Sequence, residues 1–383
     1  MLEKAMFVTV ALAFALTSYA AEDQAYLAIL AETSVMKMPG MPKIELPPGI
    51  DLSKVPGAEA MLGMGTPQRK LEVRLWSPGI APDDAFARLN VPPGLKQGSK
   101  LDLALYRPKP TRGKEGPGSD TDSAEEESSL KATMKIYWGC SDTVRPGQPR
   151  IIKWESLTPE ARELTRKQTR AMEKGGESYF YKPDWTTGYW PTQKQPGKIA
   201  PDASLVGRYE LVTNYTGGVA IEAPSNVDFL APFDLTSPNT DEPLALDKSI
   251  QLAWKQIPNA LGIYVSVVGM EGKSTIVMWN CSETEADTAG LNWDYMQMAE
   301  VRDLVQKGVM LKGEATSCSI PAGIFKDCST AFLTMIAYGP GAALDKTNPL
   351  PRIQTKSTFS MPLVTKGVPG MGGMPEPDSD GNE

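Results

Sequence analysis

The chain has 383 residues, of which 41% are hydrophobic, and it carries a formal net charge of −7 with a pI near 5.1. This length is typical of two or three domains, and the acidic balance disfavours nucleic acids and anionic membrane surfaces, which bind clustered cations. The sequence contains no histidine, which excludes Ser-His-Asp and Cys-His catalysis within the chain and zinc sites built with imidazole.

Residues 1–20 have the pattern of a secretory signal peptide. Lys4 precedes an apolar stretch, and small or polar residues then lead to a cleavage site after Ala20. The alternative, a buried N-terminal helix, is disfavoured because nothing caps it and Glu22 and Asp23 follow at once. No later run approaches the roughly 20 apolar residues of a membrane span. The sequence therefore predicts an exported protein, periplasmic or secreted, with no transmembrane segment after signal cleavage.

Pro, Gly and Met dominate the segments at both ends of the mature chain. Residues 21–66 are predicted to be a flexible lead-in and residues 366–383 a disordered tail, because this composition interrupts helices and strands. Residues 108–129 are predicted to be a disordered insert between two strands. Thioethers suit Cu(I), so the terminal methionines are candidate copper ligands, with a low-complexity linker as the alternative. These candidates are Met36, Met38, Met41, Met371 and Met374.

Residues 67–223 are predicted to form a first β domain. Alternating or β-branched stretches predict its strands, at residues 71–76, 101–106, 130–138, 150–154 and 209–213. A helix is predicted to begin after Thr158, with Pro159 as its first residue, and to end at Gly175 and Gly176. Its polar side is expected to be a solvated face, with an anion-binding face as the alternative.

An aromatic-rich segment follows this helix, interleaved with proline and glycine. Exposed rings on such a segment can stack on sugars or hold peptides. The alternative, which we favour, is that the rings pack the segment onto the first domain, since a long irregular segment must bury apolar surface to be ordered. The candidate ligand-binding residues are Tyr179, Tyr181, Trp185, Tyr189 and Trp190.

Residues 224–365 are predicted to form a second β domain. Its strands are predicted at residues 249–255, 262–268, 275–279, 309–311, 318–320, 331–338 and 358–364. A helix is predicted from Asp294, its N-cap, to Lys307, and is expected to pack on a sheet edge. Residues 250–265 resemble the B and C strands of a fibronectin-type-III or related immunoglobulin-like domain. With the turn signals between strands, this favours β-sandwiches.

A short phrase occurs twice, each time at the end of an apolar run. IYWGCSDT at residues 136–143 returns as VMWNCSET at residues 277–284. The repeat predicts a domain duplication in which Trp138 and Trp279 are core residues at equivalent strand ends.

The four cysteines of an exported protein are expected to form disulfides, since no CxxC pattern points to a metal site. Three pairings are possible, and the sequence does not choose among them. Cys318 and Cys328 bracket a segment long enough to turn back on itself, so they are the candidate disulfide. Cys140 and Cys281 would then pair across the domains or remain as buried thiols.

Several segments resemble a group of exported proteobacterial proteins without assigned function. They are residues 137–140, 145–149, 203–207 and 228–232. The resemblance implies export and two linked domains over most of the chain, and it transfers no catalytic residue.

Together these patterns predict a mainly β protein of two sandwich-like, immunoglobulin- or fibronectin-III-like domains, with two short helices and flexible termini. The expected function is that of a non-catalytic binding or structural module of the cell envelope, whose partner is an envelope protein or a glycan. The first alternative is a glycan-active hydrolase that uses a pair of carboxylates, for which no residues stand out. The second is a Met-rich Cu(I)-binding periplasmic protein. No catalytic residue is predicted, and no cofactor apart from Cu(I) in that alternative; the oligomeric state stays open.

Overall fold

The computed structural model describes residues 25–38, 65–107, 133–156, 184–239, 244–286, 288, 293–294, 296–343 and 352–365. The predicted signal peptide, the insert, the helix after Thr158 and the tail lie outside these ranges. Within them the protein is mainly β, as the sequence predicts. No helix among the described residues has the length and hydropathy that a membrane span requires.

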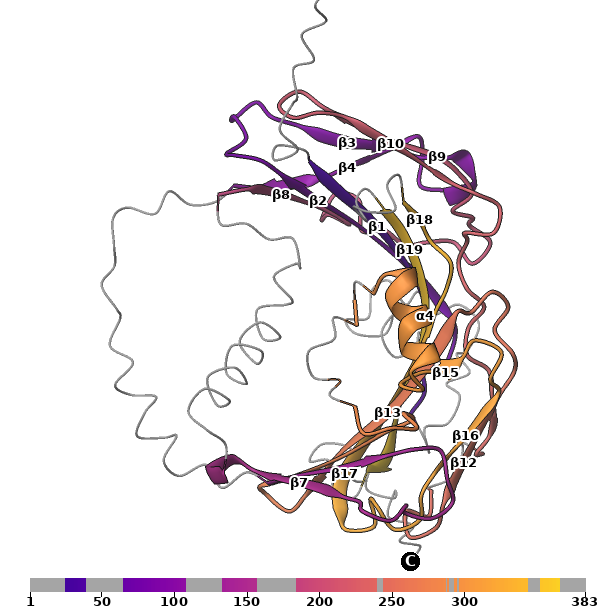
Figure 1. Cartoon of the computed structure of the whole chain (residues 1–383). Coiled ribbons are helices and arrows are strands. Elements are labelled where there is room, and N and C mark those ends of the chain that lie inside the picture. Colours follow the sequence, from indigo (N-terminus) through magenta and orange to yellow (C-terminus); the bar gives the residue numbers. More distant parts are fainter. Residues whose placement is uncertain are drawn as a thin grey trace, which may run out of the picture.

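The largest part of the fold is a twelve-stranded, strongly curved sheet with a convex outer face and a concave inner face (Figure 1). Its strands are β1 (Tyr26–Met36), β2 (Gln68–Ser77), β5 (Ala104–Tyr106), β6 (Thr133–Trp138), β7 (Arg150–Lys153), β8 (Thr186–Trp190), β13 (Gly262–Glu271), β14 (Thr275–Asn280), β15 (Leu311–Lys312), β17 (Cys328–Tyr338), β18 (Ala342–Ala343) and β19 (Arg352–Thr365). The main path is β5-β8-β2-β1-β19-β17-β13-β14-β6-β7, with β15 paired to β13 and β18 to β19.

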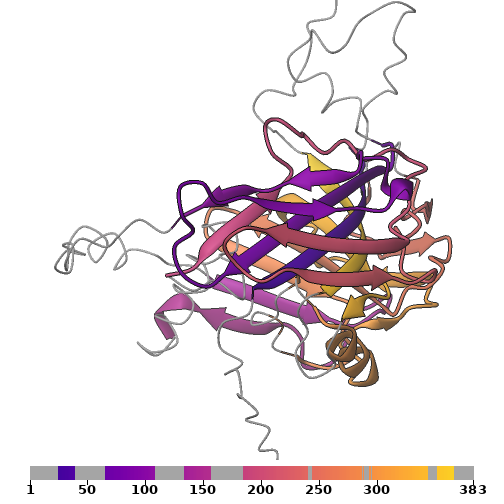
Figure 2. The same ribbon diagram turned by 90° about the horizontal axis from the view of Figure 1, so that it is seen from above.

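Two smaller sheets cover the outer face. One runs β10-β9-β3-β4 and the other β11-β12-β16. Their strands are β3 (Ala87–Asn90), β4 (Lys100–Asp102), β9 (Gly207–Thr213), β10 (Val219–Ala223), β11 (Leu235–Ser237), β12 (Ile250–Trp254) and β16 (Ser317–Ile320), and the 3-10 turns are η2 (Pro93–Leu95) and η3 (Trp154–Ser156). Seen from above, the four-stranded sheet lies over β1 and β2 (Figure 2). The three-stranded sheet lies outside β13 and β17 (Figure 1).

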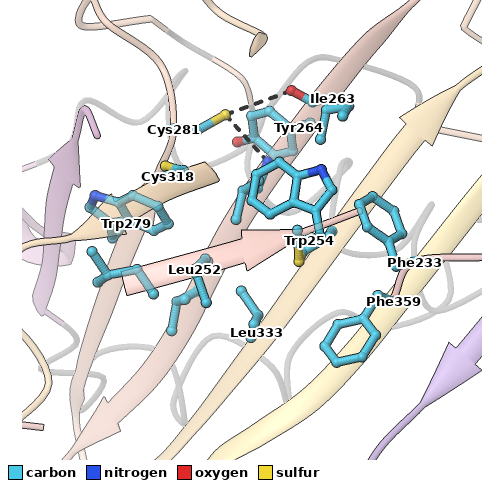
Figure 3. Close-up of a cluster of buried hydrophobic side chains, with 14 of the residues drawn as sticks. Phe233, Leu252, Trp254, Ile263, Tyr264, Trp279, Cys281, Cys318, Leu333 and Phe359 are labelled. Atoms are coloured by element: carbon cyan, nitrogen blue, oxygen red, sulfur yellow. Dashed lines mark hydrogen bonds between the residues drawn. The ribbon is translucent and has the colours of Figure 1, made fainter. Parts of the chain in front are cut away.

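Each smaller sheet closes its own hydrophobic core against the large sheet. The first core joins the outer face of β1 and β2 to β3, β4, β9 and β10. In the second, Leu252 and Trp254 of β12 lie over Leu333 of β17 and Phe359 of β19 (Figure 3). The chain passes from the first core to the second after Phe229, close to the predicted boundary.

The large sheet, however, crosses that boundary. β6 and β7 come from the predicted first domain, yet β6 pairs in parallel with β14 of the second. The two predicted domains therefore share one continuous sheet.

Tyr26–Met36 correct the prediction of a flexible lead-in. They form β1, which pairs with β2 on one side and, in parallel, with β19 on the other. Leu27, Ile29 and Ala31 alternate into the first core, which is the pattern of a strand buried on one face. The Pro- and Gly-rich residues that begin after this strand carry the prediction of a lead-in, which overlooks the alternation before them.

The doubled phrase lies on two neighbouring parallel strands. Trp279 of β14 pairs with Tyr137, and Trp138 of β6 pairs with Asn280, which is one residue out of step with the repeat. An offset of one residue turns side chains to opposite faces of a sheet. Trp279 is accordingly buried in the outer core, whereas Trp138 is only half-buried on the inner face. The prediction that both tryptophans are core residues is therefore wrong for Trp138.

The two copies of the phrase also hold the halves of the chain together. The indole N–H of Trp279 donates to the carbonyl of Gly139 at 3.1 Å, and Arg145 donates to the carboxylate of Glu283 at 2.7 Å. Gly139 has φ +98, a backbone conformation that residues with a side chain rarely adopt, so this position favours glycine.

The disulfide joins Cys140 to Cys318 rather than Cys318 to Cys328. The end of β6 lies beside β16, where the N–H of Ser141 donates to the carbonyl of Ser319 at 3.1 Å. Cys281 and Cys328 are buried thiols. The prediction relied on proximity along the chain, whereas the bonded cysteines are 178 residues apart and are brought together by the sheet.

Helix α4 (Met298–Gln306) lies on the inner side of the sheet (Figure 1). It begins after Gln297, so the predicted N-cap, Asp294, does not cap it. The helix packs closely on the start of β13 because Gly262 leaves room. A Cβ there would lie 2.7 Å from Cγ2 of Val305 and 3.0 Å from Cγ1 of Val301.

Candidate functional site

The inner face of the large sheet carries an apolar surface on β17, β13, β14, β6 and β7. Cross-strand pairing aligns its side chains in two adjacent rows. We call these residues the apolar panel; the first row is Phe332, Val268, Met278 and Ile136, and the second is Met270, Ile276, Met134 and Ile152.

Three of the eight members of the apolar panel are exposed. Phe332, Val268 and Met270 are 42%, 45% and 37% exposed, and the other members are half-buried. On the opposite face of the same strands, Val267 and Leu333 are fully buried in the second core. Apolar patches of a few hundred Å² are about the largest that monomeric proteins typically expose, and such patches are often functional.

Polar residues border the panel on two sides. Arg150 of β7 pairs opposite Ile136, so it ends the first row on the same face, and its guanidinium lies 3.1 Å from the carboxylate of Glu285. Towards α4, the next row contains hydroxyl groups, with Thr334 paired to both Ser266 and Ser360. Apart from Trp138, which ends that row, the inner face therefore changes from apolar to uncharged polar along its strands.

An ionic cluster lies farther along the inner face. Lys356 lies 3.0 Å from the carboxylate of Asp294 and 3.7 Å from that of Glu32, and Arg74 lies 3.9 Å from Asp294. Partial burial acts to raise the pKa of Asp294, but the charge and hydrogen bond of Lys356 and the charge of Arg74 together lower that pKa below its ordinary value. A glycosidase acid needs a raised pKa. This carboxylate cluster therefore does not favour the predicted hydrolase.

Replacing Lys356 with Met is expected to raise the pKa of Asp294, because partial burial then acts without its cation. A carboxyl whose pKa is lower in the folded than in the unfolded state stabilises the folded state at pH values above the unfolded pKa of about 4. This stabilisation is lost as the pH falls through the folded pKa. The variant should therefore lose about 1 kcal/mol at pH 6, since Asp294 is half exposed and solvent screens the pair.

The loss should shrink towards zero at pH 3, as measured by urea unfolding at both pH values and by carboxyl NMR titration of Asp294. Lys307→Met, which removes an exposed pair with Asp303 on α4, is the control. A loss for Lys356→Met that is equal at pH 6 and pH 3 would contradict the assignment.

Two of the predicted ligand-binding aromatics are packed inside the protein. Trp190 is 1% exposed in the first core, and its indole N–H donates to the side chain of Gln195 at 3.1 Å. Trp185 is buried and stacks on Tyr26, with ring centroids 5.5 Å apart. Neither ring offers a free face for a sugar.

The other predicted aromatics do not assemble into a platform among the described residues. Tyr189 is half-buried and meets Tyr106 edge to face, with centroids 5.6 Å apart, and Tyr106 is 59% exposed. Tyr179 and Tyr181 lie outside the described residues.

The candidate copper ligands are only partly described. Met36, 44% exposed, ends β1, and Met38 follows it half-buried. Met41, Met371 and Met374 lie outside the described residues. Within the described ranges, no group of three or more Cys, Asp or Glu side chains is placed to hold a metal ion.

The free thiols are not placed for chemistry. Burial raises the pKa of the Cys281 thiol to about 11, and burial together with the charge of Glu271 raises that of Cys328 to about 11. The thiolate is the reactive form, so both thiols are inert near neutral pH.

The apolar panel was not among the predicted sites, although β13 carries a signal for it. Val265 and Val267 face the core, while Val268 and Met270 on the same strand face the panel. Apolar residues at both odd- and even-numbered positions of a strand normally indicate that both of its faces are covered. The sequence shows this excess of apolar residues but not which of the two faces is open.

No protein-family model and no curated protein sequence matches the chain. The function must therefore be inferred from the geometry of its own residues.

Proposed function

We propose that this protein is a non-catalytic binding module whose inner sheet face holds a small apolar ligand. The observation that carries the proposal is the apolar panel, in which Val268, Phe332 and Met270 are exposed side by side on paired strands. Binding an apolar molecule would remove these side chains from water, which is the usual driving force of such recognition.

The size of the panel favours a small molecule over a protein. β17, β13, β14, β6 and β7 are consecutive in the sheet, so the panel is about 19 Å long at a strand spacing of about 4.8 Å. Its two rows are about 7 Å apart along the strands, so the area between the row centres is about 130 Å², and the width of the side chains brings the whole surface to about 300 Å². A stable protein interface needs about 800 Å² from each partner. An envelope protein is therefore the less favoured partner.

Export to the periplasm or outside the cell remains part of the proposal. Two observations support it: the N-terminal signal pattern, and the disulfide between Cys140 and Cys318, since disulfides persist mainly in oxidising compartments. The finer proposals on the fold are immunoglobulin- or fibronectin-III-like layers and a domain duplication. The presence of two cores under two small sheets supports them, whereas the repeated phrase does not support the duplication, because its two tryptophans lie on opposite faces of one sheet.

Val268→Asp is expected to weaken binding of the neutral dye Nile red at least tenfold, because a carboxylate on the panel would have to be desolvated by an apolar ligand. Fluorescence titration of the full chain measures the effect. Val212→Asp is the matched control, since Val212 is 39% exposed and points away from the first core on β9. Equal weakening by both variants, or no dye binding by the wild type, would rule the proposal out.

A further inference from the structure

We propose that the ligand of the apolar panel is a long-chain fatty acid, whose alkyl chain lies along the first row and whose carboxylate pairs with Arg150. This inference rests on the proposed function and adds the chemical class and orientation of the ligand. It follows from the length of the panel, the side chains that form it and the charge at its end.

The dimensions of the panel match an extended alkyl chain. From β7 to β17 the panel measures about 19 Å, which is close to the length of a chain of about 16 carbons. Its width of two rows accommodates one chain and leaves little room for a second. A single-chain amphiphile therefore covers the surface more completely than a compact apolar molecule.

The side chains suit a flexible partner. Met278, Met270 and Met134 contribute thioethers from three neighbouring strands, and Phe332 lies at the end of the row farthest from β7, beside Pro362 of β19. Methionine side chains are unbranched and polarisable, so they adapt their shape to alkyl chains. No residue of the first row between Phe332 and Ile136 is charged, and none of the second row is charged.

The cation that ends the first row fixes the orientation. Arg150 pairs opposite Ile136, so its side chain leaves the sheet on the same face as the panel. Its ion pair with Glu285 is exposed on both sides, at 48% and 51%, and such a pair contributes little to stability. A ligand carboxylate can therefore bind Arg150 beside Glu285 or in place of Glu285, and the planar guanidinium can bind the ligand carboxylate through two N–H donors.

The test is competition against Nile red on the full chain. Hexadecanoate is expected to displace the dye, and octanoate to require at least tenfold higher concentration, because it spans only half of the panel and buries less apolar surface. Arg150→Gln is expected to weaken hexadecanoate about fivefold or more, as loss of a charge-assisted pair predicts. The same variant should not weaken the binding of hexadecyltrimethylammonium, which has the same chain and a cationic head.

Lys153→Gln is the matched control. Lys153 lies on the same short strand as Arg150 but on the outer face and is exposed, so its loss should leave hexadecanoate binding unchanged. If Lys153→Gln and Arg150→Gln weaken hexadecanoate equally, Arg150 does not hold the carboxylate and the proposal is overturned.

The remaining outcomes separate this inference from the proposed function. If Nile red binds and Val268→Asp abolishes that binding, but hexadecanoate does not compete, the binding module stands and the fatty acid is the wrong ligand. If the wild type does not bind the dye, the panel is not an apolar binding site and both proposals fail. If the wild type sediments as a dimer that Val268→Asp dissociates, a second copy of the chain occupies the panel and both proposals fail as well.

Discussion

Joint replacement of Cys140 and Cys318 with Ala is expected to lower the free energy of unfolding by about 2–5 kcal/mol. The disulfide links residues 178 apart, and a crosslink over a long loop removes more conformations from the unfolded chain than one over a short loop. It also fastens the end of β6, which lies next to the edge strand β7 of the large sheet, to β16 in the outer layer of the second core. Urea unfolding followed by tryptophan fluorescence measures the loss.

A reductant distinguishes this pairing from the one between Cys318 and Cys328. Dithiothreitol should lower the Tm of the wild type and of Cys328→Ala, and leave the Cys140→Ala/Cys318→Ala variant unchanged. If Cys318 were bonded to Cys328, Cys328→Ala would itself be insensitive to the reductant. The high pKa values of the thiols of Cys281 and Cys328, both about 11, should keep exchange between the two pairings slow.

Asp228→Ala is expected to destabilise the protein by about 2–4 kcal/mol, because it leaves buried donors without an acceptor. The Asp228 carboxylate accepts the backbone N–H groups of Leu205 at 2.9 Å and Phe229 at 2.8 Å, and the hydroxyl of Ser204 at 2.6 Å. It thus ties together residues 203–207 and 228–232, at the point where the chain leaves the first core. Urea unfolding monitored by circular dichroism measures the effect.

Two further variants calibrate that effect. Asp228→Asn keeps one acceptor oxygen for the backbone donors, so its loss should be smaller than that of Asp228→Ala. Asp234→Ala removes a carboxylate from an exposed pair with Lys255 and should cost much less, because solvent screens such a pair. If Asp228→Ala costs no more than Asp234→Ala, the three hydrogen bonds do not hold the junction.

The sequence predicts individual strands, because their alternation is a local pattern. It does not predict which strands pair with one another. In β12 the buried residues Ile250, Leu252 and Trp254 alternate with more exposed ones, so the strand is visible in its own residues. Nothing in the residues of β6 indicates that β14 is its neighbour, because strand order depends on contacts between distant segments. The disulfide prediction was wrong for the same reason, since it replaced proximity in space with proximity along the chain.

The candidate site follows the same logic. Tyr189 and Trp190 are adjacent in sequence, but successive residues of a strand point to opposite faces, so one meets Tyr106 and the other enters the first core. A cluster of aromatics in the sequence is thus divided by the strand that carries it. The apolar panel arises in the opposite way, from residues as far apart as Met134 and Phe332 that the sheet brings onto one face.

The parallel pairing of β1 with β19 affects the order in which the protein can form. Residues 26–36 are synthesised early, yet one of their two neighbouring strands consists of residues 352–365, which are synthesised late. Until then, one edge of β1 lacks its partner at the centre of the largest sheet, and pairings of such long range form slowly. The large sheet therefore cannot be completed until β19 has left the ribosome. This delay favours an incompletely folded chain during synthesis, which is the state that the proposed export requires.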